Sequence, residues 1–219
     1  TTMDYDFGVG VDPARISFDH GIHGVQDLAS LLRRYKRPFQ IVAGHVTESD
    51  VMARAIGVAR AAHAAQRFGH TRVMRVGESF RGMGDFAVTA GVMREAFGIR
   101  LDVVGIDDLS KEVCAVSDAQ VADEIRRDKD LFHVEVAPET HERTAKVSLG
   151  LRRILDRGGY TAFSMNFLAF DRPDRPAGCV PFLEASKAMA RGLGYAGEGD
   201  TLTACLVGAL NAGFESTTF

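Results

Sequence analysis

One glutamate flanked by glycines has the clearest chemical potential in this sequence. Glu198 lies within residues 192–200, which read GLGYAGEGD, between two segments that the pattern predicts as helices. The glycines allow a tight turn and a close backbone approach. Such a turn can present a carboxylate as a ligand for a hard metal ion or as an acid–base group. For an isolated Glu-Gly-Asp, a solvated loop carboxylate or one favoured by the following helix N-terminus is the more common case.

Three glycines of this segment also match a second sequence motif. Gly192, Gly194 and Gly197 have the GxGxxG spacing of a dinucleotide-binding turn. That turn requires a strand before the glycines and a helix after them. Residues 184–191 have a helical pattern instead, so the sequence disfavours nicotinamide or flavin binding. A cofactor titration without saturable binding would exclude it.

Histidines form a weaker set of candidates. His20 and His23 have a His-x-x-His spacing, which is too common to define a metal site, and two histidines in a loop or at a helix start explain it as well. His45 follows a predicted strand, where α/β sheets often carry ligand-binding groups. These residues alone do not predict a metal centre.

Alternating apolar segments predict the elements that must position these residues. Strands are expected at residues 39–43, 72–76, 101–106 and 160–167. Helices are expected at residues 24–34, 48–68, 92–97, 118–127, 138–158, 184–191 and 201–212, with Gly98 as a C-cap and Asp200 as an N-cap. Residues 1–20 have the composition of a loop.

This alternation predicts an α/β fold, a doubly wound parallel sheet with helices on both faces (Rossmann-like). We expect this domain over residues 71–219. Residues 1–70 are expected to be the end of a preceding α/β domain with a connecting helix.

Ligands of open α/β sheets bind beyond the carboxyl ends of the strands. The glycine-rich loop at residues 77–86 follows such an end, and its Phe80 and Met83 are candidates for an apolar pocket wall or a neighbouring interface. Phe163, Met165 and Phe167 alternate, so we expect them on one strand face, with core packing as the default.

Composition excludes several classes of protein. The formal net charge is −3, so no basic surface indicates nucleic-acid binding. Apolar runs are too short to cross a bilayer, and the first residues lack a signal-peptide pattern. The three cysteines, Cys114, Cys179 and Cys205, are widely spaced and predict reduced thiols in a cytoplasmic protein.

Several motifs together resemble the L-arabinose isomerase family, within the wider arabinose/fucose isomerase superfamily. The most specific is the segment from Gly194 to Asp200, followed by Thr203 and Ala204. Weaker matches occur in the same order along the chain: His23-Gly24, Gly44-His45, residues 75–81 (RVGESFR), residues 87–89 (AVT), residues 158–163 (GGYTAF) and Phe167.

The resemblance implies an aldose–ketose isomerase that moves a proton between two sugar carbons through an ene-diol. In this family two glutamates and two histidines hold a divalent cation, usually Mn²⁺, and Glu198 matches the first glutamate. Phe80 matches an apolar residue against the sugar, and Phe167 matches a pocket aromatic. His23 matches a histidine presented to the site of an adjacent subunit, so a homo-oligomer is implied.

Departures from the family pattern concern the sugar and the ligand set. Thr201 or Leu202 replaces a frequent aromatic, and two extra residues lie near positions 82–85, so the resemblance leaves the sugar open. Residues 216–219 resemble the approach to the second glutamate, which Glu215 does not match. We therefore expect a chain truncated before the C-terminal domain, with one of four metal ligands, weak Mn²⁺ binding and no isomerase activity alone.

A rival function belongs to another class of protein. Sugar-binding and regulatory α/β domains share the same alternation of strands and helices, and fold alone does not determine function. The parent reading frame separates the two hypotheses. A glutamate shortly after Phe219, followed by two histidines, would favour the isomerase, whereas a stop codon would favour a non-catalytic domain.

Overall fold

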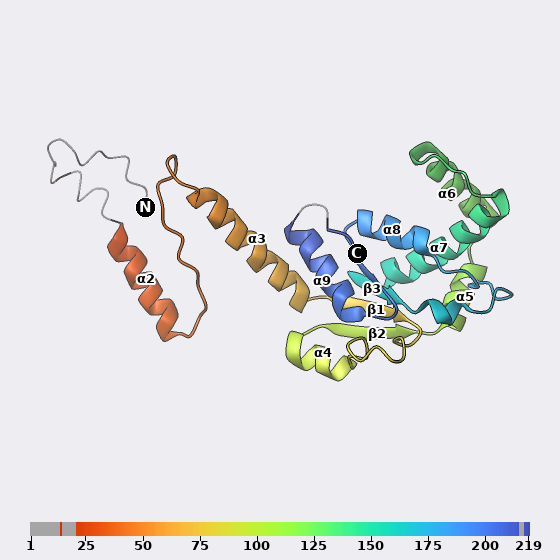
Figure 1. Cartoon of the computed structure of the whole chain (residues 1–219), viewed down its shortest axis with the longest axis horizontal. Helices are drawn as coiled ribbons and strands as arrows, with labels where there is room; N and C mark the ends of the chain where they lie inside the picture. Colours follow the sequence, from red (N-terminus) through yellow and green to blue (C-terminus); the bar gives the residue numbers. More distant parts are fainter. Residues whose placement is uncertain (1–13, 15–20, 215–216) are drawn as a thin grey trace. The chain divides into compact units, whose positions relative to one another are not determined.

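The computed structural model describes residue 14, residues 21–214 and residues 217–219 (Figure 1). It divides the chain into two compact units, residues 1–62 and 63–219. The predictions for His20, for most of the loop at residues 1–20 and for residues 215–216 lie outside the described residues. The assignment of residues 1–70 and 71–219 to two domains of a longer enzyme stays a prediction. Among the described residues, no helix combines the length and apolar character needed to cross a membrane.

The first unit contains helix α2 (Ile22–Arg34) and the start of helix α3 (Val51–Gly69), both close to their predicted ranges. The strand predicted at residues 39–43 is wrong: this segment is irregular, and Ile41 is 70% exposed. A strand needs a neighbour for its backbone N–H and C=O groups. The described part of this unit contains no other strand that could be that neighbour.

The second unit contains a four-stranded parallel sheet. Its strands are β1 (Arg72–Val76), β2 (Arg100–Val104), β3 (Ala162–Met165) and β4 (Gly194–Gly197), in the order β2-β1-β3-β4. The doubly wound α/β prediction is confirmed, as are β1, β2 and β3. The sequence pattern missed β4, since half of its residues are glycines, which strands disfavour.

Helices cover both faces of the sheet (Figure 1). Helices α4 (Ala90–Phe97) and α9 (Thr201–Gly213) pack on one face, and α5 (Ile106–Cys114), α7 (Pro138–Gly158) and α8 (Phe182–Ala190) pack on the other. Helix α6 (Asp118–Leu131) packs against α7. Helix α5 was not predicted, whereas the others lie near their predicted ranges, with Asp200 and Gly98 capping as expected.

Alternation along the strands divides the core into two layers. Met74, Phe163 and Tyr195 face α5, α7 and α8, whereas Val73 and Ala162 face α4 and α9. Phe163 and Met165 are core residues, as expected. Phe167 is not on their strand: it begins the 3₁₀ helix η1 (Phe167–Phe170) and is 40% exposed, because Asn166 ends the strand and caps this turn.

Close backbone packing fixes α9 on β4. A Cβ atom on Gly194 would lie 2.0 Å from the carbonyl oxygen of Ala204 and 2.5 Å from the amide nitrogen of Gly208. Only a glycine permits this approach. The glycines that obscured β4 in the sequence therefore hold the helix that follows Glu198.

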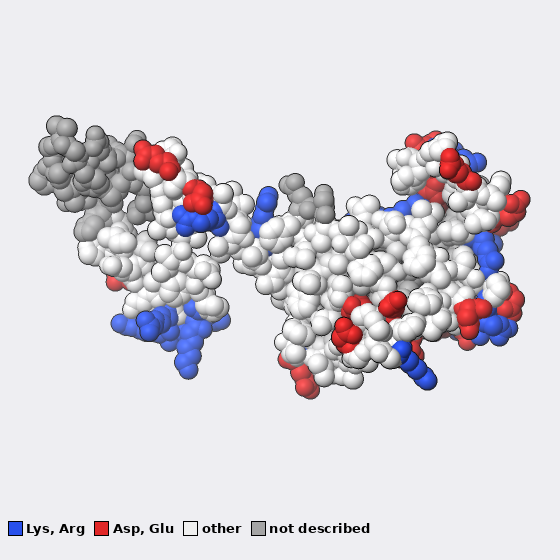
Figure 2. All heavy atoms as spheres, in the orientation of Figure 1, with Lys and Arg blue, Asp and Glu red and all other residues white. Residues whose placement is uncertain are grey.

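Figure 2 shows charged side chains of both signs in groups around the second unit, with a wide uncharged area between them. Two exposed ion pairs lie within single helices, Lys111 with Asp108 at 2.7 Å and Arg126 with Asp123 at 2.8 Å. Exposed pairs of this kind contribute little to stability.

Candidate functional site

The candidate site lies where the strand order reverses. From β1 the chain continues to β2 on one side, and β3 later pairs with β1 on the other. At such a reversal the loops after the strands separate and leave a crevice. In this protein the loops after β1 and β3 stay in contact, because the Asn166 side-chain amide donates a hydrogen bond to the Glu78 carbonyl at 2.9 Å. The cavity lies beside this contact, beyond β3 and β4.

Glu198 occupies a turn that the rest of the site holds in place. It directly follows β4 and has φ = 60°, the left-handed region that is unfavourable for a residue with a side chain. The Phe80 N–H donates to the Glu198 carbonyl at 2.9 Å. Backbone strain of this kind persists where the surrounding structure enforces it, and it concentrates at functional sites.

Gly199 holds the same turn from the other side. Its φ is 83°, and a Cβ atom at this position would lie 2.7 Å from the Ser79 Cα and 3.0 Å from the Glu78 carbonyl oxygen. The loops after β1 and β4 are therefore in direct backbone contact. This contact fixes the direction in which the Glu198 side chain leaves the turn.

Arg75 holds the loop after β1 through hydrogen bonds of its side chain. The side chain is buried, although it is charged. It donates hydrogen bonds to the Gly77 carbonyl at 3.0 Å, to Ser79 Oγ at 2.9 Å and to Glu78 Oε2 at 3.1 Å. No separate role was predicted for Arg75, although a charged residue inside an apolar strand is a signal that the sequence contains.

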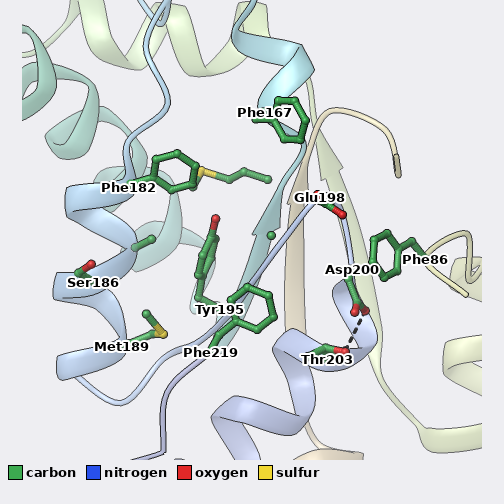
Figure 3. Close-up of a pocket in the computed structure, with 13 residues that line it drawn as sticks. Phe86, Phe167, Phe182, Ser186, Met189, Tyr195, Glu198, Asp200, Thr203 and Phe219 are labelled. Atoms are coloured by element: carbon green, nitrogen blue, oxygen red, sulfur yellow. Dashed lines mark hydrogen bonds between the residues drawn. The ribbon is translucent and has the colours of Figure 1, made fainter. Parts of the chain in front are cut away.

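Glu198 opens onto a cavity of about 510 Å³ (Figure 3). The cavity walls are mainly aromatic and aliphatic, and its few polar groups come from α8, β4 and the start of α9. The lining residues are Phe86, Met165, Phe167, Phe182, Ala185, Ser186, Met189, Tyr195, Gly197, Glu198, Asp200, Thr203 and Phe219. An apolar cavity with a few convergent polar groups is typical of a small-molecule site.

Three of the predicted site residues are brought together. Phe167 and Glu198 line the cavity, and the Phe80 ring lies against Phe167 with 5.5 Å between the ring centroids. Neither Phe80 nor Met83 is among the lining residues, so the prediction that they form the wall of this cavity is wrong. The alternative, that they lie in a neighbouring interface, stays a prediction. His23 is an exposed residue of α2 in the first unit.

The carboxylates at the cavity are Glu198 and Asp200. Asp200 Oδ1 accepts a hydrogen bond from the Thr203 N–H at 3.0 Å and so caps α9. Among the residues that the structure describes, no three His, Cys, Asp or Glu side chains are grouped so that they could hold a metal ion. These residues do not by themselves fit a complete cation site.

His45 forms local contacts instead of a ligand site after a strand. Its Nδ1 lies 3.0 Å from Thr47 Oγ1, and its carbonyl accepts from Ser49 Oγ at 2.7 Å. The strand expected before it is absent, so the reason for expecting a ligand-binding position at His45 is lost.

The GxGxxG glycines also differ from a dinucleotide-binding turn. Gly194 and Gly197 are the two ends of β4, so these glycines belong to the strand and do not form a turn after it. The predicted helix–helix junction around Glu198 is therefore wrong, since Glu198 lies between a strand and a helix. The mechanism of phosphate binding at a helix N-terminus requires the glycines in the turn, so the structure gives this reading no support.

Comparisons with known proteins show which family the second unit resembles. Residues 72–213 match the family model described as the L-arabinose isomerase central domain. The chain is 31% identical over 217 residues to L-arabinose isomerase 1 of Bacillus licheniformis, covering 95% of this chain and 43% of that protein. It is 34% identical over 211 residues to L-arabinose isomerase of Nocardioides sp., covering 91% of this chain and 40% of that protein. The chain thus spans less than half the length of these relatives.

Proposed function

This chain belongs to the L-arabinose isomerase central-domain family, and we propose from that premise that it forms part of an aldose–ketose isomerase of the L-arabinose to L-ribulose type. One observation carries the proposal. Glu198 is held in a left-handed turn by Phe80 and Gly199, at the mouth of an apolar cavity of small-molecule size. A carboxylate on a strained, enforced backbone turn beside such a cavity suits proton transfer on a bound substrate.

In this proposal Glu198 is the proton-transfer group. Its carboxylate takes the proton from C2 of the open-chain aldose. The electron pair left on carbon forms the C1–C2 double bond while the carbonyl oxygen on C1 takes up a proton, which gives an ene-diol. The carboxylate then returns its proton to C1, and the C2 hydroxyl loses its proton to give the ketose carbonyl. The sugar is isomerised without any net gain or loss of atoms or electrons.

The aromatic side chains of the site have a separate task in this scheme. Phe167 presents an apolar surface to the cavity, and the Phe80 ring packs against the Phe167 ring. Such surfaces pack against the C–H faces of a sugar and reduce the water around Glu198, which strengthens electrostatic interactions there. Phe80 also holds the Glu198 carbonyl through its backbone, so it couples the two parts of the site.

We also propose Mn²⁺ as the cofactor, with Glu198 as one of its ligands. A bound divalent cation would polarise the sugar carbonyl as a Lewis acid. Because the described residues do not group three ligands, this part of the proposal is supported by family membership and by the Glu198 carboxylate alone. Weak Mn²⁺ binding by the 219-residue chain is expected.

Family membership further supports two proposals about assembly. We propose that the enzyme is a homo-oligomer and that His23 contributes to the site of a neighbouring subunit. His23 is exposed on α2, as a residue in contact with another subunit's site must be before assembly.

The decisive experiment measures conversion of L-arabinose to L-ribulose, with Mn²⁺ present, by the product of the complete reading frame that contains these residues. Glu198→Gln keeps the size of the side chain but removes the base, and we expect a loss of turnover of at least about 100-fold with the unfolding midpoint preserved. The matched control is Glu95→Gln, an exposed glutamate of α4 outside the cavity lining. Sugar binding without turnover in the parent protein would instead support a non-catalytic sugar-binding domain. Full activity in Glu198→Gln would overturn the role of Glu198.

A further inference from the structure

We propose that the Tyr195 hydroxyl is a sugar-binding group of the cavity, donating a hydrogen bond to an oxygen of the bound sugar on the α8 side of Glu198. This inference rests on the proposed function, because it assigns the sugar to the same cavity. It adds a residue that helps determine which ligands the cavity accepts.

The Tyr195 ring is fixed within the core. It belongs to β4 and is 5% exposed. The Phe163 ring lies 5.0 Å from it, and the Phe219 ring meets it edge-on at 6.1 Å. With its ring held by these neighbours, Tyr195 has a defined direction for its hydroxyl group.

That hydroxyl extends along the cavity, between the Phe182 side and the Glu198 side (Figure 3). Among the described residues, none forms a hydrogen bond with it, whereas the Tyr160 hydroxyl, the other tyrosine of this unit, donates to Asp102 Oδ2 at 3.0 Å. The hydroxyl is not one of the buried side-chain atoms that lack a partner, so it is open to the cavity that Tyr195 lines. It can therefore donate to an acceptor that a ligand in the cavity supplies.

The surroundings of the hydroxyl suit a polyhydroxylated ligand. Phe167 and Phe182 offer aromatic faces, and Ser186 and Thr203 add polar side chains to the same lining. Sugars combine apolar C–H faces with hydroxyl edges, so they match such a mixed lining better than a purely apolar ligand does. Burial raises the pKa of Tyr195 to about 12, so the group remains a neutral donor at all ordinary pH values.

The experiment titrates the chain with L-arabitol, an open-chain polyol that lacks the reactive carbonyl, and follows the amide NMR signals of residues 195–199. Tyr195→Phe removes only the hydroxyl. We expect it to weaken L-arabitol binding about 3- to 10-fold, the range for one neutral hydrogen bond, with no loss of stability towards urea. Tyr160→Phe is the matched control, since its hydroxyl lies outside the cavity and its loss should leave L-arabitol binding unchanged.

The outcomes separate this inference from the proposed function. If L-arabitol shifts the cavity amides and Glu198→Gln weakens its binding but Tyr195→Phe does not, the sugar site stands and the role of Tyr195 is overturned. If L-arabitol leaves the cavity amides unchanged in the unaltered chain, the assignment of the sugar to this cavity fails, and the role of Tyr195 fails with it. Loss of both stability and binding in Tyr195→Phe would mean that the hydroxyl is structural, which also overturns the proposal.

Discussion

The backbone N–H of Phe80 donates a hydrogen bond of 2.9 Å to the carbonyl of Glu198. This bond joins the loop after β1 to the turn after β4, although the two strands are separated in the sheet by β3. The aromatic residue near the cavity wall and the carboxylate at its mouth therefore cannot move independently.

The contact between Gly199 and Ser79 should tolerate no side chain. Gly199→Ala combines a φ of 83° with a Cβ atom 2.7 Å from the Ser79 Cα. We expect the free energy of unfolding to fall by about 2–4 kcal/mol, from backbone strain and steric overlap together. Urea denaturation followed by circular dichroism measures this. Gly192→Ala is the control: its φ is 93°, but no atom lies within 4 Å of the added carbon, so a loss of only about 1 kcal/mol is expected. Equal losses in the two variants would contradict the steric argument.

Arg75 should control the order of the loop that carries Phe80. Arg75→Met keeps much of the side-chain volume but removes the hydrogen bonds to Gly77, Glu78 and Ser79. We expect faster hydrogen exchange at the Phe80 amide and a loss of about 1–3 kcal/mol of stability. Arg81→Met, at an exposed position of the same loop, should change neither. Unaltered exchange at Phe80 in Arg75→Met would show that the loop is held by other contacts.

Buried charges should hold α8, which forms one wall of the cavity. The Glu184 side chain is fully buried and accepts hydrogen bonds from Arg152 at 2.6 Å and from Arg191 at 2.5 Å. Removing the Glu184 charge leaves Arg152 with Glu124 as its remaining partner and Arg191 partly exposed, so we place the cost at the lower end of the roughly 3–5 kcal/mol for breaking a buried pair. We expect a loss of this order for Glu184→Gln in urea denaturation. Asp174→Asn breaks an exposed pair with Arg172 and should have little effect. A small effect of Glu184→Gln would mean that Arg152 finds full compensation elsewhere.

Glu124 should make stability depend on pH in the acid range. Burial alone would raise its pKa, but hydrogen bonds from Arg152 and Lys187 outweigh burial and lower it from 4.5 to about 2. The folded state thus favours the ionised form. The resulting stabilisation is complete above about pH 4.5 and is lost as the pH falls towards 2, with roughly 3 kcal/mol at stake.

Urea midpoints measured from pH 6 to pH 3 test this dependence. Glu124→Gln removes the titrating group, so the variant should be less stable at pH 6 and should lose less stability on acidification. A parallel decline in both proteins would assign the acid sensitivity to other carboxylates.

The sequence alone determined the elements whose signals are local. The range of β1 is as predicted, Pro138 begins the long helix α7, Gly98 ends α4, and Asp200 caps α9. Caps, helical periodicity and short apolar runs operate over a few residues, so they can be recognised without the rest of the chain. The motif around Glu198 was also specific enough to indicate the family.

Tertiary structure decided what depends on partners far away in the chain. Residues 39–43 have a strand composition but no strand in the described part of their unit to pair with, whereas the glycine-rich β4 becomes a strand because β3 pairs with it and α9 packs directly on it. The left-handed conformation of Glu198, the buried hydrogen bonds of Arg75 and the direction of the Tyr195 hydroxyl arise only when several elements meet. A strand, a cavity and an enforced turn are relations between distant segments, and local sequence does not encode such relations.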